Sequence, residues 1–175
     1  MNIFGDKVVL RAIELYDLDL LLNLINDPDT EKMLGGNSFP ISKESQKKWI
    51  EGQENRNDIL RCIVALKDNI ENGLGTIILS DIDYKNGIAQ VHIKMAKGHG
   101  RGKGYGTDAL QTFVRYAFDE LRLNCIYAYV LAYNIPSQKL FEKCRFKREG
   151  VLRSRVFKNG KYVDVFSFSI LREDI

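Results

Sequence analysis

Apolar residues follow a fixed order of strand-like and helix-like spacing along the chain. A short apolar run at residues 7–11 predicts a first strand. Apolar positions with helical spacing then predict a first helix, at Leu18, Leu21, Leu22 and Ile25. Asp17 is placed to cap this helix and Pro28 to end it. Turn-forming residues at 32–40 predict a loop, after which Ser42 is expected to cap a second helix reaching about residue 54.

Three β-rich runs follow, at residues 59–66, 74–79 and 88–96. Asn-Gly pairs separate them, at residues 72–73 and 86–87. Asn-Gly accommodates the positive φ angles of a tight hairpin turn. The three runs are therefore expected to form three antiparallel strands.

After these strands, glycine takes every second position from Gly98 to Gly106. Apolar residues at helical spacing over residues 110–121 then predict a helix that packs on the sheet. A strand, a glycine loop and a helix N-terminus turn free N–H groups and the helix dipole toward one point, which suits an anion such as phosphate. The next run, residues 125–131, should lie parallel to the strand at 88–96, because a helix connects them by a right-handed crossover.

The last part of the chain predicts one more helix and a hairpin. Asn134 is expected to cap the helix. Residues 151–157 and 162–171 should pair around a third Asn-Gly turn at 159–160. Since no repeat or linker interrupts the pattern, we expect a single mixed α/β domain over residues 1–175.

Composition narrows the classes of function. The 175 residues are 45% hydrophobic, and 26 Lys and Arg against 23 Asp and Glu give a charge of +3, too mild to argue for nucleic acid. The three cysteines, Cys62, Cys125 and Cys144, are far apart without metal-ligand spacing, so reduced thiols and no metal are expected. No secretion signal and no membrane-length apolar run is present, so we expect a cytoplasmic protein that does not contact a membrane.

Two common phosphate-binding motifs can be tested against the glycine run. The dinucleotide fingerprint G-x-G-x-x-G fails in every register, because its last position falls on Lys103, Tyr105 or Thr107. The mononucleotide loop fails because Gly102-Lys103 is followed by another glycine. What remains is R-G-x-G-x-G over residues 101–106, with basic residues interleaved among the glycines. Anion binding is the better interpretation, and a flexible surface turn is the alternative.

Five segments together resemble one family: LRAIELYDLDLLLNLIND, QVHIKM, RGKGYGTDAL, NIPSQKLFEK and FKREGVLRSRVFKNGKYVDV. The chain resembles the GNAT superfamily of N-acetyltransferases, particularly the branch of ribosomal-protein alanine and spermidine N-acetyltransferases. The acetyl-CoA motif of that family, Q/R-x-x-G-x-G/A, is matched by Arg101, Gly104 and Gly106. The resemblance covers nearly the whole chain and agrees with the order of elements read from the hydrophobic pattern.

The resemblance implies a mostly antiparallel seven-stranded sheet, one parallel pair at the acetyl-CoA site and about four flanking helices. In the family, backbone N–H groups hold the CoA pyrophosphate, and the pantetheine arm lies between two splayed parallel strands, here residues 90–96 and 125–131. The implied cofactor-binding residues of this chain are Met95, Arg101, Gly102, Lys103, Gly104, Tyr105, Gly106, Thr107, Asn134 and Ser137. Acetyl-CoA would be a co-substrate, and no metal is implied.

The catalytic residues are less clear, because two positions depart from the family. Gln90 stands where many relatives carry a glutamate base, and an amide cannot accept a proton at neutral pH. His92, on the same strand face, has an ordinary pKa of roughly 6.5 and could be the base or a structural histidine. Phe141 stands where many relatives have a tyrosine acid, so Ser137 or Tyr133 would have to donate the proton, directly or through water.

A third departure is conformational. Relatives carry glycine before Phe146, where this chain has Arg145. That glycine commonly ends the preceding helix in the left-handed conformation, so Arg145 is expected to cost about 1 kcal/mol there. No change in function is implied.

We therefore predict an acetyl-CoA-dependent N-acetyltransferase that transfers acetyl directly to a primary amine. The acceptor stays open among a protein N-terminus, an amino sugar, a polyamine and an aminoglycoside. Its pocket should be formed by residues 33–39, the helix of Trp49 and the final hairpin. The alternative is a catalytically weakened CoA-binding module of the same fold, suggested by Gln90 and Phe141. Many relatives dimerise, so a homodimer is left open.

Overall fold

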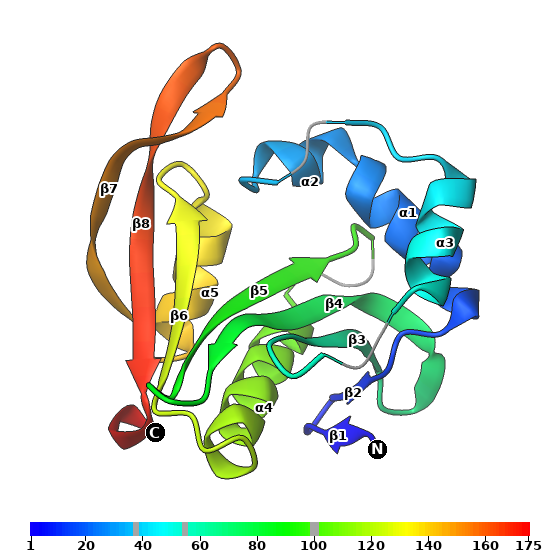
Figure 1. Cartoon of the computed structure of the whole chain (residues 1–175), viewed down its shortest axis with the longest axis horizontal. Coiled ribbons are helices and arrows are strands. Elements are labelled where there is room, and N and C mark those ends of the chain that lie inside the picture. The colour runs from blue at the N-terminus through cyan, green and yellow to red at the C-terminus, as the bar shows by residue number, and fades with distance from the viewer. Residues whose placement is uncertain (37–38, 54–55, 99–101) are drawn as a thin grey trace.

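A computed structural model describes residues 1–36, 39–53, 56–98 and 102–175 (Figure 1). Its strands are β1 Ile3–Phe4, β2 Val8–Arg11, β3 Leu60–Leu66, β4 Asn69–Asp83, β5 Ile88–Met95, β6 Cys125–Leu131, β7 Lys147–Lys158 and β8 Lys161–Leu171. They form one eight-stranded sheet in the order β1-β2-β3-β4-β5-β6-β8-β7. Only β5 and β6 pair in parallel, as the sequence predicts. The strand beyond the expected seven is the two-residue β1.

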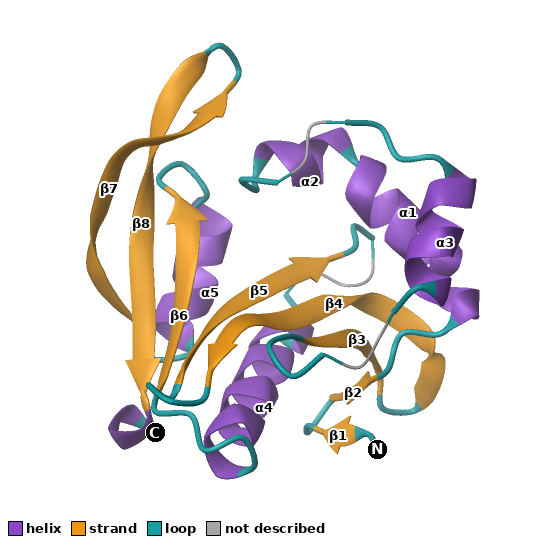
Figure 2. Ribbon diagram, viewed as in Figure 1, coloured by secondary structure: helices purple, strands orange, loops and turns teal. Residues whose placement is uncertain are grey.

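Helices cover both faces of this sheet (Figure 2). They are α1 Leu18–Asn26, α2 Pro28–Lys32, α3 Lys43–Glu51, α4 Tyr105–Asp119 and α5 Ile135–Lys143. Buried residues of α4 and α5 share the main core with one face of the sheet, whereas Leu21 of α1 and Ile50 of α3 pack on the other face, against Val9 and Ile63. This layering follows from the amphipathic pattern, because each helix buries only one apolar stripe.

The parallel pair separates shortly after it begins. Its register runs over Ile88↔Cys125, Ala89↔Ile126 and Gln90↔Tyr127 and ends there. Beyond this point β5 continues along β4, and β6 continues along β8 (Figure 1). The two strands therefore diverge and leave an opening between their carboxyl ends.

The predicted hairpin turn at residues 72–73 is wrong. The chain turns at residues 67–68, and Gly73 lies within β4, paired with Ala65 at a bulge. A Cβ atom on Gly73 would lie 2.5 Å from Leu20 Cδ2 of α1. Glycine is required here because α1 packs closely against β4, and sequence alone does not distinguish this from a turn.

The predicted capping role of Asp17 is also wrong. Its carboxylate makes no capping hydrogen bond to α1 and instead accepts two bonds of 2.8 Å from the Arg11 guanidinium and one of 2.8 Å from the Glu14 N–H. Both charged side chains are buried, with 4% of Arg11 and 2% of Asp17 exposed. A bidentate buried pair satisfies more of the carboxylate than a single capping bond does.

Pro28 ends α1 as predicted, but it also begins the additional helix α2. The sequence predicts no element for residues 28–31 and a loop from residue 32. Asp27 caps α2 by accepting a hydrogen bond from the Thr30 N–H at 2.9 Å. Five residues are too few to show an amphipathic period, so the capping pair was the only available signal.

The other turn and cap predictions are confirmed. The turn before β5 contains Gly87 at a φ of 66°, and the β7–β8 turn contains Asn159 and Gly160 at 51° and 79°. Arg145 ends α5 at a φ of 68°. The N–H groups of Arg145 and Phe146 donate to the carbonyls of Glu142 and Phe141, both at 3.0 Å, so the helix ends in a Schellman motif without glycine.

Candidate active site

A cavity of about 480 Å³ occupies the opening between β5 and β6. Gln90, His92 and Lys94 of β5 line one side, and Tyr129 of β6 lies opposite. Further residues come from the segment after α2, from α5 and from the final hairpin, and they include Met33, Gly36, Asn134, Ser137, Leu152 and Arg155. Segments far apart in sequence therefore meet at the divergence of the two strands.

The N-terminus of α4 adjoins the end of β5. Gly104 precedes the helix in the left-handed conformation, with a φ of 83°, and no side chain caps the first turn. The first-turn N–H groups are therefore without a side-chain partner from the cap residue. A Cβ atom on Gly106 would lie 3.7 Å from Met95 Cγ, so α4 packs directly on the last residue of β5. Arg101, the first residue of the predicted motif, lies outside the described residues.

Asp108 anchors this turn to the start of the sheet. Its carboxylate accepts hydrogen bonds from the N–H groups of Asp6, Lys7 and Val8 at 3.1, 2.8 and 2.9 Å. The Lys7 ammonium also donates to the Lys103 carbonyl at 2.8 Å. These contacts hold the predicted anion-binding turn in place from the side of β2.

His92 belongs to a short polar chain on the cavity side of the sheet. Its Nε2 atom lies 2.8 Å from Ser80 Oγ, and the Ser80 hydroxyl donates to Asp81 at 3.0 Å. A hydroxyl has one proton, so a Ser80 that donates to Asp81 can only accept from Nε2–H, and this pairing corresponds to the neutral tautomer whose Nδ1 carries no proton. The pKa of His92 lies below its ordinary value of 6.5, mainly through loss of hydration and then through the Lys94 charge, with Asp81 acting in the opposite direction.

Gln90 faces the same cavity without a titratable group. In the strand register it lies between Ser80 of β4 and Tyr127 of β6, at the last paired position of the parallel strands. It is therefore placed at the root of the opening, beside His92.

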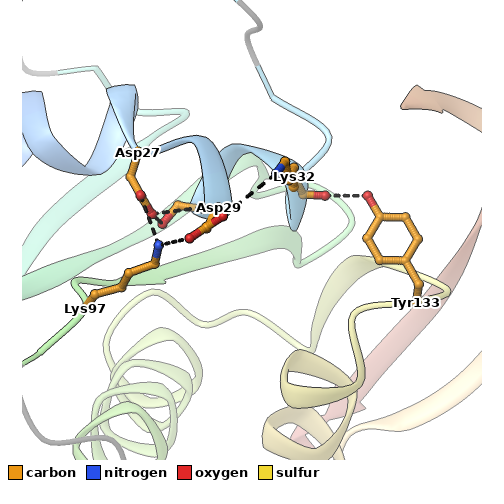
Figure 3. A network of polar contacts seen from close by, with 6 residues as sticks. Asp27, Asp29, Lys32, Lys97 and Tyr133 are labelled. Atoms are coloured by element: carbon orange, nitrogen blue, oxygen red, sulfur yellow. Dashed lines mark hydrogen bonds and ion pairs between the residues drawn. The ribbon is translucent and has the colours of Figure 1, made fainter. Parts of the chain in front are cut away.

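The start of α5 brings two predicted residues to the cavity. Asn134 Oδ1 accepts from the Ser137 N–H at 3.2 Å, which confirms the predicted cap, and its Nδ2 donates to the Met33 carbonyl at 2.9 Å. Ser137 lines the cavity. Tyr133 is not among the described lining residues, and its hydroxyl donates to the Lys32 carbonyl (Figure 3). Its role as an acid stays a prediction.

Ionic contacts tie the start of α2 to the end of β5 (Figure 3). Lys97, just after β5, pairs with Asp27 at 3.1 Å and with Asp29 at 2.5 Å. The Thr30 hydrogen bond, with a further contribution from Lys97, lowers the pKa of Asp27 to about 2. At the far end of α2, Glu31 pairs with Lys158 of the final hairpin. The segment that follows α2 is thereby held above the cavity from two sides.

A second cavity, of about 390 Å³, is lined by Trp49 of α3, whereas residues 33–36 and the final hairpin line the first cavity. The parts of the predicted substrate pocket are thus divided between two cavities, and that pocket stays a prediction. Lys94 lines both cavities. Sequence reasoning missed Lys94, Arg61 and Ser80. The alternation of Gln90, His92 and Lys94 along one strand was a signal that Lys94 shares their face. The other two are revealed only by the register of β3, β4 and β5.

Comparison with known proteins identifies the family. Residues 7–147 match the family described as acetyltransferase (GNAT) domain. The chain belongs to the GNAT acetyltransferase family. It is 33% identical to an uncharacterised N-acetyltransferase, p20, of Bacillus licheniformis, over 99% of this chain and 97% of that protein. It is 31% identical to spermidine N(1)-acetyltransferase of Vibrio cholerae, over 96% and 95% of the two chains.

A solved structure shows the same fold over nearly the whole length of this GNAT chain. Spermidine N-acetyltransferase from Vibrio cholerae, in complex with CoA and spermine, superposes with a TM-score of 0.86 at 29% identity, covering 95% of this chain and 96% of that one. This GNAT protein is an N-acetyltransferase, as its domain and its relatives show.

Two further properties concern the described residues alone. No three or more His, Cys, Asp or Glu side chains of the described ranges are grouped so that they could hold a metal ion. None of the helices in those ranges has both the length and the apolar character to cross a bilayer.

Proposed function

We propose that this protein transfers the acetyl group of acetyl-CoA directly to a primary amine in the opening between β5 and β6. The observation that carries the proposal is that His92, whose Nε2 is bonded to Ser80 and whose pKa is lowered, lines the cavity where the parallel strands diverge. A neutral imidazole at pH 7 can take the proton that an attacking amine must lose.

The residues around the opening suit CoA. Backbone edges of β5 and β6 beyond Gln90 and Tyr127 no longer pair with each other, so an extended chain such as pantetheine can lie between them. The turn at Gly104 and the first turn of α4 offer N–H groups and a positive helix end to the pyrophosphate. We assign to this site the residues implied by the sequence, which are Met95, residues 101–107, Asn134 and Ser137. When bound, acetyl-CoA supplies an activated acetyl group and a thiolate leaving group.

The side chains of this protein then divide the chemistry. His92 Nδ1 accepts the amine proton, and the Ser80–Asp81 pair holds the ring in the required tautomer. Lys94, two residues along the same face, disfavours a second positive charge and so favours the neutral amine. Ser137 in the same cavity can donate its proton to the leaving thiolate, and Tyr133 is the more distant candidate.

The cysteines support direct transfer without an acetylated enzyme. Burial raises the pKa of Cys62 to about 12 and that of Cys144 to about 11. Burial, as the largest cause, also raises the pKa of Cys125. A thiolate is the nucleophile in covalent transfer, so none of the three thiols is prepared for that role.

An amine panel tests the proposal. The protein is incubated with acetyl-CoA and with peptides, amino sugars, polyamines, aminoglycosides and amino acids, and both thiol release and acetylated product are scored. At least one amine should raise thiol release and appear as its N-acetyl product. CoA binding by calorimetry without turnover of any amine would favour the weakened module. In that case Gln90→Glu should restore a large rate, whereas no effect of Gln90→Glu on an active protein points to His92.

The cytoplasmic location stays a prediction, and the homodimer stays an open alternative.

A further inference from the structure

The second cavity has an apolar wall built from α1, α3, β4 and the segments that contain Ile13 and Ile41. Its apolar lining consists of Ile13, Leu21, Leu24, Ile25, Ile41, Trp49 and Ile78. Its volume, about 390 Å³, falls at the lower end of the range of small-molecule sites, roughly 300–1,000 Å³. Lys94 lines both this cavity and the opening between β5 and β6, so its side chain borders the two spaces. We call the second cavity the acceptor pocket.

Two cations and no carboxylates line the acceptor pocket. Its charged lining residues are Arg61 and Lys94, and no Asp or Glu belongs to the described lining. Among the described residues neither cation has a carboxylate within 4.0 Å, although ten other pairs in the same ranges meet that distance. Asp58 attracts Arg61 only from beyond that distance, and it is itself paired with Arg56. Within the described part of the chain, no carboxylate therefore forms an ion pair with the two cations of the pocket.

The Arg61 guanidinium is held in a fixed orientation. It lies over the Trp49 ring at 5.6 Å from the ring centroid. Its Nη1 donates to Gln53 Oε1 at 3.1 Å, and Gln53 Nε2 donates to the Trp49 carbonyl at 2.8 Å. A preorganised guanidinium loses little entropy when it binds a planar anion in bidentate geometry.

The strand register places both cations near His92. Arg61, Ile78 and His92 are direct neighbours across β3, β4 and β5, so about 10 Å separates the outer two backbones. Lys94 lies two residues from His92, about 7 Å along the same strand face. An amine at His92 and an anionic group between Lys94 and Arg61 can therefore belong to one small molecule.

We propose that the acceptor is a small amine that carries a carboxylate on an apolar body, of the class of apolar amino acids. The inference rests on the proposed acetyl transfer and names its substrate class. A carboxylate neutralises the two cations, and the apolar body fills the Leu- and Ile-rich wall. A polyamine would bring further positive charge to Arg61 and Lys94 without a described carboxylate to receive it.

Matched amines test the inference by kcat/KM for thiol release. The set is L-leucine, L-leucinamide, 1,5-diaminopentane and spermidine, which vary the charge beside the reacting amine. We expect L-leucine to exceed the other three by at least about 10-fold, since one tenfold step corresponds to 1.4 kcal/mol of discrimination. Equal or better use of the amide, the diamine or spermidine would overturn the inference and leave acetyl transfer intact.

Charge variants locate the preference. Arg61→Gln should reduce the preference for leucine over leucinamide several-fold, and Arg61→Glu should reverse it. Arg153→Glu, at an exposed position of β7, changes the net charge by the same amount as Arg61→Glu and should leave the preference unchanged. A preference that does not respond to Arg61, or that responds equally to Arg153, would contradict the assignment.

Binding without turnover separates this inference from the proposed function. Trp49 is the only tryptophan of the chain and lines the acceptor pocket, so its fluorescence reports occupancy directly. L-leucine should change this fluorescence at lower concentration than L-leucinamide. A fluorescence response with that order but no acetylation would support the pocket and overturn acetyl transfer. No response to any of the four ligands would overturn the inference.

Discussion

The two halves of the active site are built from different parts of the chain. The proposed CoA side consists mainly of backbone: the edges of β5 and β6, the left-handed turn at Gly104 and the first turn of α4. The acceptor pocket consists of side chains from β3, β4, β5, α1 and α3. Backbone groups are the same in every sequence, whereas side chains can be exchanged. The proposed CoA side therefore depends little on which side chains the sequence carries, whereas the proposed acceptor pocket changes with them.

His92→Gln should have the largest effect, because it should lower the rate of transfer without weakening CoA binding. It removes the proton acceptor but keeps an amide near Ser80, so kcat should fall by roughly 100- to 1,000-fold. The Kd of CoA, measured by calorimetry, should stay within about 2-fold, because His92 is not part of the CoA assignment. A variant that keeps the full kcat would show that positioning, rather than His92, accounts for the transfer.

Gly104→Val should produce the next largest effect, on the opposite half. A β-branched residue at a φ of 83° is strained by about 1–3 kcal/mol, which corresponds to roughly a 10- to 100-fold rise in the Kd of CoA. Gly160→Val is the matched control, because Gly160 has a similar φ of 79° in the β7–β8 turn, outside the CoA assignment, and an added Cβ atom there meets nothing within 4 Å. Equal Kd values for the two variants would contradict the role of the left-handed turn.

Lys94→Met tests the side chain shared by both cavities. Its positive charge lowers the pKa of His92, second to burial, so its removal should raise that pKa. Activity that depends on neutral His92 is lost as pH falls through this pKa, which lies below 6.5 in the native protein. The acid limb of kcat/KM should thus move to higher pH by a fraction of a unit. A limb that stays in place or moves to lower pH would contradict the assignment of His92.

Arg145→Gly should have the smallest effect and should leave both halves unchanged. The left-handed conformation strains arginine, so glycine should raise the free energy of unfolding by about 0.5–1 kcal/mol. The Arg145 contact to the Asp174 carbonyl, at 3.4 Å on the surface, offsets little of this gain. Denaturant unfolding of Arg145→Gly and Arg145→Ala provides the comparison, and equal stability of the two variants would contradict the strain.

Local chemistry explains which features could be predicted from sequence. The glycine turn before α4, the Asn134 cap, the left-handed Arg145 and two of three Asn-Gly turns depend on backbone preferences of a few neighbouring residues. The turn predicted at Asn72-Gly73 was wrong because glycine at this position is required by the packing of α1 on β4, which is a long-range contact. The Asp17 prediction was wrong for another reason: Arg11, only six residues earlier on β2, binds its carboxylate in place of the helix end.

The candidate site divides in the same way. His92 and Gln90 could be placed on one strand face by alternation alone, and Ser137 and Asn134 by their position at a helix start. Ser80 and Arg61 join the site only through the pairing of β3, β4 and β5, which a single sequence does not specify. The charge of the acceptor pocket, and the acceptor class inferred from it, therefore could not be predicted without the register of these strands.

Direct transfer between two adjoining cavities is the central claim, and initial-rate kinetics tests it most directly. The rate of thiol release is measured while acetyl-CoA and the most active amine of the panel are both varied. Direct transfer predicts intersecting double-reciprocal lines, and no acetyl group on the protein after incubation with acetyl-CoA alone. Parallel lines, together with a mass increase of one acetyl group on the chain, would contradict the account.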